Sequence, residues 1–398
     1  MKTKHMLKRN CALALLLSLV ILGCGGENRN SVGQIGTNYK LEIVDSIQFD
    51  ILSRSLWIVD VDSINGDMLV IQPSNPPKAW LFDKYLNILE EFEKPDGDPE
   101  GTGEYITSGA FFDGGIALMG RHILNIYDRN FGLKKSLRPH FSPSSLVYVG
   151  FKNLFEFRDQ VGNPQLATYF GKPQLDIFGD KPEFYEQFNL IDVVNPALSN
   201  SSKDTVFIPF GELTPNSRYL KGKAFHFLRP KFDVKENKLY YALNDDTTFF
   251  VRSLPNGDIL ESYTIPFDKY ILSQGYSFGI KAVAEQNEKR DRPGQIENVF
   301  HSNGLDVVVY NSGLKMSEMA VYEGSEDFYE RLAHLDYKKY LILKNGVRLN
   351  EELKLDERVY YVQFADNEGN LYASQDSRVL DEEPEKYTIY KLRIVEDN

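Results

Sequence analysis

The chain has 398 residues and a formal net charge of −12. This acidity argues against nucleic acid as a partner, because phosphates require a basic face, and against electrostatic adhesion to anionic lipid. The length suits one large repeat fold or about two to three ordinary domains. The 23 Tyr and 26 Phe exceed what a helical bundle of this size would need, and they suit the half-buried surfaces of β-sheets.

The start of the chain predicts a lipoprotein signal peptide over residues 1–23. Four Lys or Arg among the first ten residues precede an apolar run from Cys11 to Leu22. That run would rise only about 18 Å as a helix, too little for a ~30 Å hydrocarbon core, and is typical of a cleavable signal. It closes on "ILGC", residues 21–24, which resembles the bacterial lipobox. In such lipoproteins the chain is cut before the cysteine, so Cys24 is the predicted lipid attachment site.

The same segment predicts where the protein resides. Acyl chains on Cys24 would anchor it to the membrane, since each buried CH₂ contributes about 0.8 kcal/mol. Gly25 stands where an aspartate would favour retention in the inner membrane, so we expect the outer membrane. Cys11 leaves with the leader, and no disulfide, catalytic cysteine or thiolate metal site is then expected. Residues 24–38 are polar and glycine-rich, which predicts a flexible tether.

A repeat in the body of the chain predicts the fold. The stretches "AWLFDKYLNILEEF" and "LNIYDRNFGLKKSL" each hold an apolar pair, an aspartate, a polar turn and a second apolar run. Their aspartates, Asp83 and Asp128, are 45 residues apart. Two further short strands precede each stretch, "LWIVDV" and "DMLVIQ" before the first, "YITSGAFF" and "GIALMG" before the second. Four strands in about 40–50 residues are typical of one propeller blade.

Later copies of the repeat are more diverged. Pro255–Gly257 and the pair Asn345–Gly346 each predict a tight hairpin turn. An acidic insertion with helical character, Ser325–Leu335, separates two strands of one copy. The stretch Phe141–Leu220 contains "LVYVGF", "LFEFRD" and "TVFIPF", which predict at least one irregular blade.

The two ends of the chain predict how the ring closes. The C-terminal stretches "RVYYVQFADNEGNLYAS" and "YTIYKLRIV" supply three strands, and "YKLEIVDSIQF" at 39–49 can supply the fourth. Pairing the termini would leave no open sheet edge. We therefore predict an all-β fold with a single β-propeller over residues 39–398, with six blades. Seven blades are the alternative if Phe141–Leu220 holds two, and a row of β-sandwiches is the other fold considered.

These features resemble a known family. The lipobox, the tether, the "LFDKYLNILEEF" hairpin and the following "DGDPEGTGEY" loop look like the six-bladed, TolB-like β-propeller lipoproteins of Gram-negative bacteria. In that family a glycine-rich loop ending in an acidic residue and an aromatic follows such a hairpin, here Gly97–Tyr105. The resemblance covers nearly the whole mature chain and is weakest between residues 141 and 220. It implies a propeller fold and an envelope location, and it supplies no common catalytic motif.

One loop resembles the start of a calcium site. Asp96, Asp98 and Glu100 place oxygen ligands at alternate positions, and Gly101 follows at the sixth. Ca²⁺ takes several oxygens at about 2.3–2.6 Å, which such a loop can bring together. The twelfth position is Thr107 rather than the glutamate that completes an EF-hand. The alternative is an acidic, solvated turn, and no other cofactor is predicted.

Two further motifs have weaker support. "GYSFG" at 275–279 has the spacing of a hydrolase nucleophile elbow around Ser277, but an all-β chain lacks the strand-to-helix turn that this motif needs. The histidines of the mature chain show no paired metal-binding spacing, so each is expected to be packed or on the surface. They are His122, His140, His226, His301 and His334. His122 lies in a turn that could reach a propeller face.

The sequence favours a non-catalytic binding or assembly platform over an enzyme. Propeller loops converge at one end of the ring and form a broad, rigid surface. The excess of acid predicts a neutral or basic partner, either a protein or a glycan, together with the membrane contact through Cys24. The alternative is a metal-assisted, lactonase-like hydrolase acting at the mouth of the channel. It would require Asp, Glu, Asn or His side chains from several blades to converge on the axis.

Overall fold

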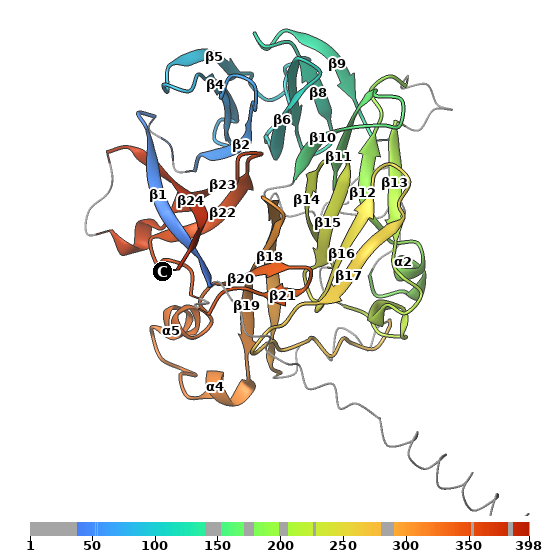
Figure 1. The fold of residues 1–398 in the computed structure, drawn as a ribbon, viewed down its shortest axis with the longest axis vertical. Helices are drawn as coiled ribbons and strands as arrows, with labels where there is room; N and C mark the ends of the chain where they lie inside the picture. Colours follow the sequence, from blue (N-terminus) through green and yellow to red (C-terminus); the bar gives the residue numbers. More distant parts are fainter. Residues whose placement is uncertain are drawn as a thin grey trace, which may run out of the picture. The chain divides into compact units, whose positions relative to one another are not determined.

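The strands of the chain form six four-stranded antiparallel sheets arranged as the blades of a β-propeller (Figure 1). The computed structural model describes residues 38–51, 53, 55–139, 153–170, 179–198, 206–225, 228–279, 290–351, 354–380 and 385–397. The predicted signal peptide, the predicted lipid site Cys24 and all of the predicted tether except Asn38 lie outside these residues. The propeller predicted from the 45-residue repeat is confirmed.

The first three blades take their strands in chain order. Blade 1 holds β2 (Trp57–Val61), β3 (Met68–Gln72), β4 (Lys78–Phe82) and β5 (Ile88–Glu93). Blade 2 holds β6 (Ser108–Phe112), β7 (Gly115–Met119), β8 (Leu124–Tyr127) and β9 (Leu133–Leu137). Blade 3 holds β10 (Leu154–Arg158), β11 (Pro164–Thr168), β12 (Asn189–Val194) and β13 (Phe207–Glu212).

The last three blades include the one that joins the two ends of the chain. Blade 4 holds β14 (Pro230–Lys235), β15 (Lys238–Leu243), β16 (Thr248–Ser253) and β17 (Ile259–Thr264). Blade 5 holds β18 (Arg292–Ser302), β19 (Leu305–Leu314), β20 (Lys339–Lys344) and β21 (Val347–Arg348). Blade 6 holds β22 (Val359–Ala365), β23 (Asn370–Gln375), β24 (Tyr387–Glu396) and β1 (Tyr39–Phe49).

The ring closes as the sequence predicts. β1 pairs antiparallel with β24, from Tyr39 opposite Glu396 to Phe49 opposite Tyr387 (Figure 1, blue beside red). The strand from one terminus thus completes the blade made by the other, which removes an open edge. The stretch Phe141–Leu220 supplies one described blade, with "LFEFRD" in β10 and "TVFIPF" in β13. The count is therefore six, and the seven-blade alternative is wrong. The stretch "LVYVGF" lies outside the described residues.

The two aspartates from which the repeat was predicted, Asp83 and Asp128, stabilise the turns that follow them. Asp83 Oδ1 accepts hydrogen bonds from the backbone N–H groups of Tyr85 and Asn87, at 2.8 and 2.9 Å. Asp128 Oδ1 accepts the equivalent bonds from Asn130 and Gly132, at 3.1 and 2.8 Å. A short carboxylate that bonds the backbone two and four residues on fixes a tight turn. The same turn recurs at two positions that sequence reasoning missed, Asp159 and Asp366.

Apolar side chains fill the space between neighbouring blades. Each of six buried clusters among the described residues draws on two adjacent blades, so that together they cover the whole ring. Tyr and Phe are prominent in them, for example Phe92 against Tyr127 between blades 1 and 2, with ring centroids 5.3 Å apart. Burial of such a ring stabilises the fold by about 2–3 kcal/mol. The aromatic excess of the sequence is thus used largely in packing.

The connections divide the propeller into two faces. In blades 1 to 5, the turns between strands one and two and between strands three and four lie at one end, and the turn between β22 and β23 of blade 6 lies at the same end. We call this end the short-turn face. The remaining connections lie at the other end, the long-loop face. They hold the described helices: α2 (Pro182–Glu186), α4 (Met316–Ala320), α5 (Phe328–Leu335) and the 3-10 turns η1 (Arg218–Leu220) and η2 (Ser377–Val379). The insertion Ser325–Leu335 thus forms α5, as its helical character predicts.

Candidate functional site

The axis of the propeller is lined by the first strand of each blade. Neighbours in the ring β2, β6, β10, β14, β18 and β22 contact one another in that order, and β22 returns to β2. A side chain bonds a backbone group of the next blade at every one of these junctions. The bridging side chains are Asp60, Asn153, Glu156, Asp233, Asn298 and Gln363. The blades are therefore joined near the axis by hydrogen bonds as well as by apolar packing.

One small cavity lies at the described part of the axis, where first strands of several blades meet. The cavity there measures about 10 Å³, the size of a single water site. Phe155, Phe300 and Phe364 contribute to its lining from three different blades. Larger openings lie away from the axis, where the linkers between blades cross the long-loop face.

The predicted calcium loop lines one of these openings, a cavity of about 510 Å³ that also includes Arg121, His122 and Arg138. Asp98 Oδ1 accepts a hydrogen bond from the backbone of Glu100 at 2.8 Å, and Glu100 itself pairs with Lys94 at 3.1 Å. Within the described ranges, no group of three or more His, Cys, Asp or Glu is arranged to hold a metal ion. Calcium at Asp96, Asp98 and Glu100 stays a prediction, which a calcium titration would test.

Ser277 and the described histidines lie in different parts of the propeller, and His122 and His334 are exposed. Ser277 lies in the linker between blades 4 and 5, where Tyr276 forms an isolated β-bridge with Ala224. Residues 280–289, where the helix of a nucleophile elbow would follow, lie outside the described residues. His301 in β18 bonds Asp306 Oδ1 at 2.7 Å and stacks on Tyr240 with ring centroids 3.8 Å apart. His334 lies in α5, whereas His140 and His226 fall outside the described residues.

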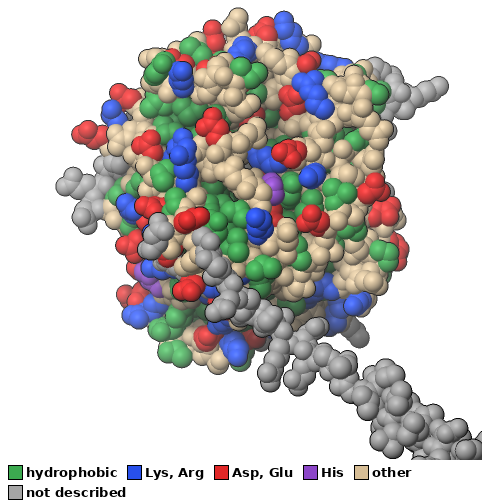
Figure 2. Space-filling model, viewed as in Figure 1, with side chains coloured by type: hydrophobic (Ala, Val, Ile, Leu, Met, Phe, Trp, Pro, Cys, Tyr) green, Lys and Arg blue, Asp and Glu red, His purple; other side chains and the backbone are tan. Residues whose placement is uncertain are grey.

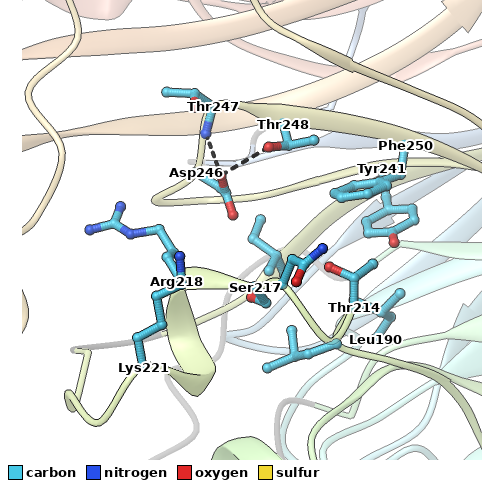
Figure 3. A pocket seen from close by; sticks show the side chains of 13 residues that line it. Leu190, Thr214, Ser217, Arg218, Lys221, Tyr241, Asp246, Thr247, Thr248 and Phe250 are labelled. Carbon is cyan, nitrogen blue, oxygen red and sulfur yellow. Dashed lines mark hydrogen bonds between the residues drawn. The ribbon is translucent and has the colours of Figure 1, made fainter.

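A second opening, the blade 3/4 pocket, lies between β12 of blade 3 and β15 and β16 of blade 4 (Figure 3). The linker 213–221 and the turn 246–248 surround it on the long-loop face. Its volume is about 400 Å³, within the ~300–1,000 Å³ of small-molecule sites. It is lined by Leu190, Leu213, Thr214, Asn216, Ser217, Arg218, Lys221, Tyr241, Leu243, Asp246, Thr247, Thr248 and Phe250.

Aromatic and aliphatic side chains form one wall of this pocket. Tyr241 and Phe250 stack with ring centroids 5.1 Å apart and an angle of 13° between their planes. Arg252 donates a hydrogen bond to the Tyr241 hydroxyl at 3.0 Å, which fixes that ring. Both rings lie side by side in Figure 3, with Leu190 and Thr214 nearby. The wall therefore offers a flat, preorganised apolar surface beside hydrogen-bonding groups.

A carboxylate from the turn before β16 also faces the pocket (Figure 3). Asp246 Oδ1 accepts hydrogen bonds from the Thr247 backbone N–H at 2.6 Å and from the Thr248 hydroxyl at 3.3 Å. The second carboxylate oxygen points into the pocket in Figure 3. Burial raises the pKa of Asp246 above its usual value. The side chain is thus held in place, with one oxygen directed toward whatever fills the pocket.

The nearby guanidinium is engaged by the protein itself. Arg218 Nη1 donates to the backbone oxygen of Asp245 at 3.0 Å, and Nη2 donates to the backbone oxygen of Ser273. The group also lies over the ring of Phe225, 4.9 Å from its centroid. Burial raises the pKa of the Asp245 carboxyl beside it to about 6. Arg218 therefore ties the linker between blades 3 and 4 to the body of blade 4.

Sequence reasoning missed this pocket. Its polar residues come from "LTPNS" at 213–217 and "DTT" at 246–248, about 30 residues apart. The only local signal is the concentration of hydroxyl side chains in both stretches, and neither stretch forms a known motif.

Charges of both signs are dispersed over the surface. Figure 2 shows Lys and Arg side chains interspersed with Asp and Glu and with hydrophobic groups over the face in view. Several are paired, for example Lys78 with Glu93 at 2.6 Å and Lys269 with Glu318 at 2.9 Å. Among the described helices, none is long and apolar enough to cross a membrane.

Comparison with known proteins gives the class of fold. No family model and no curated protein matches the chain. A member of the DUF4221 family from Bacteroides vulgatus is similar in structure, with a TM-score of 0.57, 13% identity, and coverage of 91% of this chain and 99% of that one. A Bacteroides fragilis protein whose name describes it as exported is also similar, with a TM-score of 0.50, 11% identity, and coverage of 91% of this chain and 98% of that one. At such identities the likeness concerns the six-bladed propeller fold alone.

Proposed function

We propose that the chain is an exported, lipid-anchored binding protein whose long-loop face is a platform for a protein or glycan partner. The observation that carries this proposal is the contrast between the filled axis, with a cavity of about 10 Å³, and the openings of about 400 and 510 Å³ on the long-loop face. A rigid ring that offers its openings at one face suits recognition of a partner.

The same contrast favours the platform over a metal-assisted hydrolase at the mouth of the channel. That alternative needs room for a substrate on the axis and ligands that converge there from several blades. The described axis is instead packed with Phe155, Phe300 and Phe364, and its polar side chains bond the neighbouring blades. No described arrangement specifically favours catalysis.

Site-directed photo-cross-linking in the native cell envelope tests the platform. A photoreactive residue replaces Glu104 or Asn216, both exposed on the long-loop face, or Ile64 or Val161, which are 93% and 82% exposed on the short-turn face. We expect adducts from positions 104 and 216 and none from 64 and 161. Adducts of equal yield from both faces, or none from any position, would contradict the proposal.

The anchor is proposed from the basic start, the short apolar run and the lipobox-like "ILGC". The fold similarity to a protein named as exported supports the location. Mass spectrometry of the mature N-terminus is the test. We expect a first residue Cys24 that carries acyl chains, and a Cys24→Ser variant that leaves the membrane fraction or accumulates uncut. A mature chain that begins elsewhere, or carries a free thiol at Cys24, would overturn the anchor.

A further inference from the structure

The polar groups of the blade 3/4 pocket are mostly neutral. Thr214, Ser217, Thr247 and Thr248 bring four hydroxyls, and Asn216 brings an amide. Hydroxyls and amides both donate and accept hydrogen bonds, so they can pair with a ligand that does the same. The pocket therefore matches a ligand rich in hydroxyl groups better than one recognised by charge.

The two walls of the pocket are suited to different parts of such a ligand. A sugar ring has a face of C–H groups and a rim of hydroxyls. The half-buried ring of Phe250, held in place by the buried Tyr241 stacked on it, offers a flat apolar surface for the C–H face. The Asp246 oxygen that points into the pocket can accept hydrogen bonds from the hydroxyls, and bonds to a carboxylate are roughly twice as strong as neutral ones.

The charged groups of the lining do not form a dedicated anion site. Asp246 offsets part of the positive charge, and Arg218 directs donors to the backbone of Asp245 and Ser273 rather than into the pocket. Lys221 is the other cation in the lining, and its side chain lies on the exposed rim. By comparison, the cavity beside the predicted calcium loop has three cationic or basic side chains, Arg121, His122 and Arg138, and it lacks the paired aromatic wall.

We propose that the blade 3/4 pocket binds one residue of a neutral glycan, with Phe250 against the C–H face of the sugar and Asp246 bonded to its hydroxyls. This inference rests on the proposed function of the long-loop face as a binding surface. Of the two kinds of partner proposed there, a protein or a glycan, it selects the glycan.

Binding of full-length protein, purified in mild detergent, to an array of neutral, acidic and phosphorylated glycans is the first test. Neutral glycans bound on the array are then titrated by calorimetry. Asp246→Asn keeps the shape of the side chain and removes its charge, and Phe250→Ala removes half of the stacked pair. Each is expected to weaken binding at least tenfold. Asp258→Asn, the same exchange at an exposed position between β16 and β17 on the short-turn face of blade 4, is the matched control and should leave affinity unchanged. Circular dichroism checks that each variant is folded.

The outcomes separate this inference from the platform itself. Neutral-glycan binding lost in Asp246→Asn and Phe250→Ala but kept in Asp258→Asn supports it. Binding only to acidic or phosphorylated glycans, or neutral binding that the pocket variants do not change, overturns it. If no glycan binds while the cross-links at positions 104 and 216 form, the glycan pocket is wrong and the platform stands. If neither glycan binding nor cross-links are found, both proposals fail.

Discussion

The axis and the blade 3/4 pocket are both places where neighbouring blades meet, but one is filled and the other is open. At the axis, buried Phe rings and bridging side chains such as Gln363 leave about 10 Å³. At the pocket, the linker 213–221 crosses the space between blades 3 and 4 and leaves about 400 Å³. We infer that the axis contributes mainly to stability and that the blade 3/4 pocket contributes mainly to binding.

This division has a physical basis. A buried polar group is costly unless it is bonded, so the axis tolerates few changes. The pocket residues Asp246 and Phe250 are only half-buried. Substituting them should therefore lower the free energy of unfolding less than a substitution at the axis does, and should weaken ligand binding more. Stability and binding should therefore respond to different substitutions.

The largest effect on stability is expected at the junction between blades 6 and 1. Gln363 donates to Leu56 O at 3.0 Å and accepts from Ile58 N at 3.1 Å. Gln363→Leu leaves both backbone groups buried without that partner, and we expect the free energy of unfolding to fall by about 3 kcal/mol. Urea unfolding measures it. Gln72→Leu, which removes a similar bond at the surface, is the control and should cost about 0.5 kcal/mol or less.

That prediction would be contradicted if the two Gln variants were equally stable. We also expect Gln363→Leu, measured at a low temperature at which it is folded, to bind the glycan with the affinity of the wild type. If Gln363→Leu lost both stability and glycan affinity, the axis and the pocket would not be separable.

A second effect is a dependence of stability on pH at the axis. Burial raises the pKa of Asp60 from 3.8 to about 7, while its oxygens accept bonds from Val61 and Phe111. Between these pH values the folded protein holds a proton that the unfolded chain has released, so this group's contribution to stability falls as pH rises. The slope is at most about 1.4 kcal/mol per pH unit.

Urea unfolding at pH 5, 6, 7 and 8 tests it. Asp60→Asn removes the titrating group, and we expect the variant to lose less stability than the wild type between pH 5 and 8. If the free energy of unfolding changed with pH in the same way in both proteins, Asp60 would be excluded as the source of the pH dependence.

The turns that repeat along the chain should show a smaller effect. Asp83→Ala removes the acceptor of the two backbone N–H groups at Tyr85 and Asn87 in an exposed turn, and it should lower the free energy of unfolding by less than Gln363→Leu does, because water can replace the lost bonds. Asp366 is buried and also accepts a hydrogen bond from the Tyr372 hydroxyl at 3.0 Å. Asp366→Ala should therefore lower the free energy of unfolding more than Asp83→Ala does. Equal costs at the two turns would mean that burial does not set the effect.

The smallest effect on stability is expected at the pocket. Asp246→Asn keeps an oxygen for Thr247 N and Thr248 Oγ1, and it relieves a carboxylate whose pKa is raised by burial. We expect the free energy of unfolding at pH 7 to change by about 0.5 kcal/mol or less. A loss comparable with that of Gln363→Leu would assign Asp246 a structural role.

Much of the fold could be predicted because its signals are local. The 45-residue spacing of Asp83 and Asp128 reflects a turn that each aspartate forms with its own neighbours. Ring closure followed from counting strands, since the last blade lacked a fourth. The blade within Phe141–Leu220 was harder to read, because α2 separates its second and third strands and breaks the regular spacing.

The site was less predictable because its residues meet only in the folded chain. Asp246 and Thr214 belong to different connections, and nothing near either residue marks the other as a neighbour. The bridges at the axis present the same difficulty, since Gln363 bonds residues more than 300 positions away in sequence. The "DGDPEG" loop had a readable local pattern, but its structure pairs Glu100 with Lys94.

Ligand-induced stabilisation tests the separation of axis and pocket most directly. The midpoint of thermal unfolding is measured for the wild type, Gln363→Leu and Asp246→Asn, each with a series of neutral oligosaccharides. A ligand at about 100 times its Kd should stabilise the folded protein by about 2.7 kcal/mol. We predict equal stabilisation of the wild type and Gln363→Leu, and little for Asp246→Asn. Equal stabilisation of Asp246→Asn, or none of the wild type by any saccharide, would contradict the account.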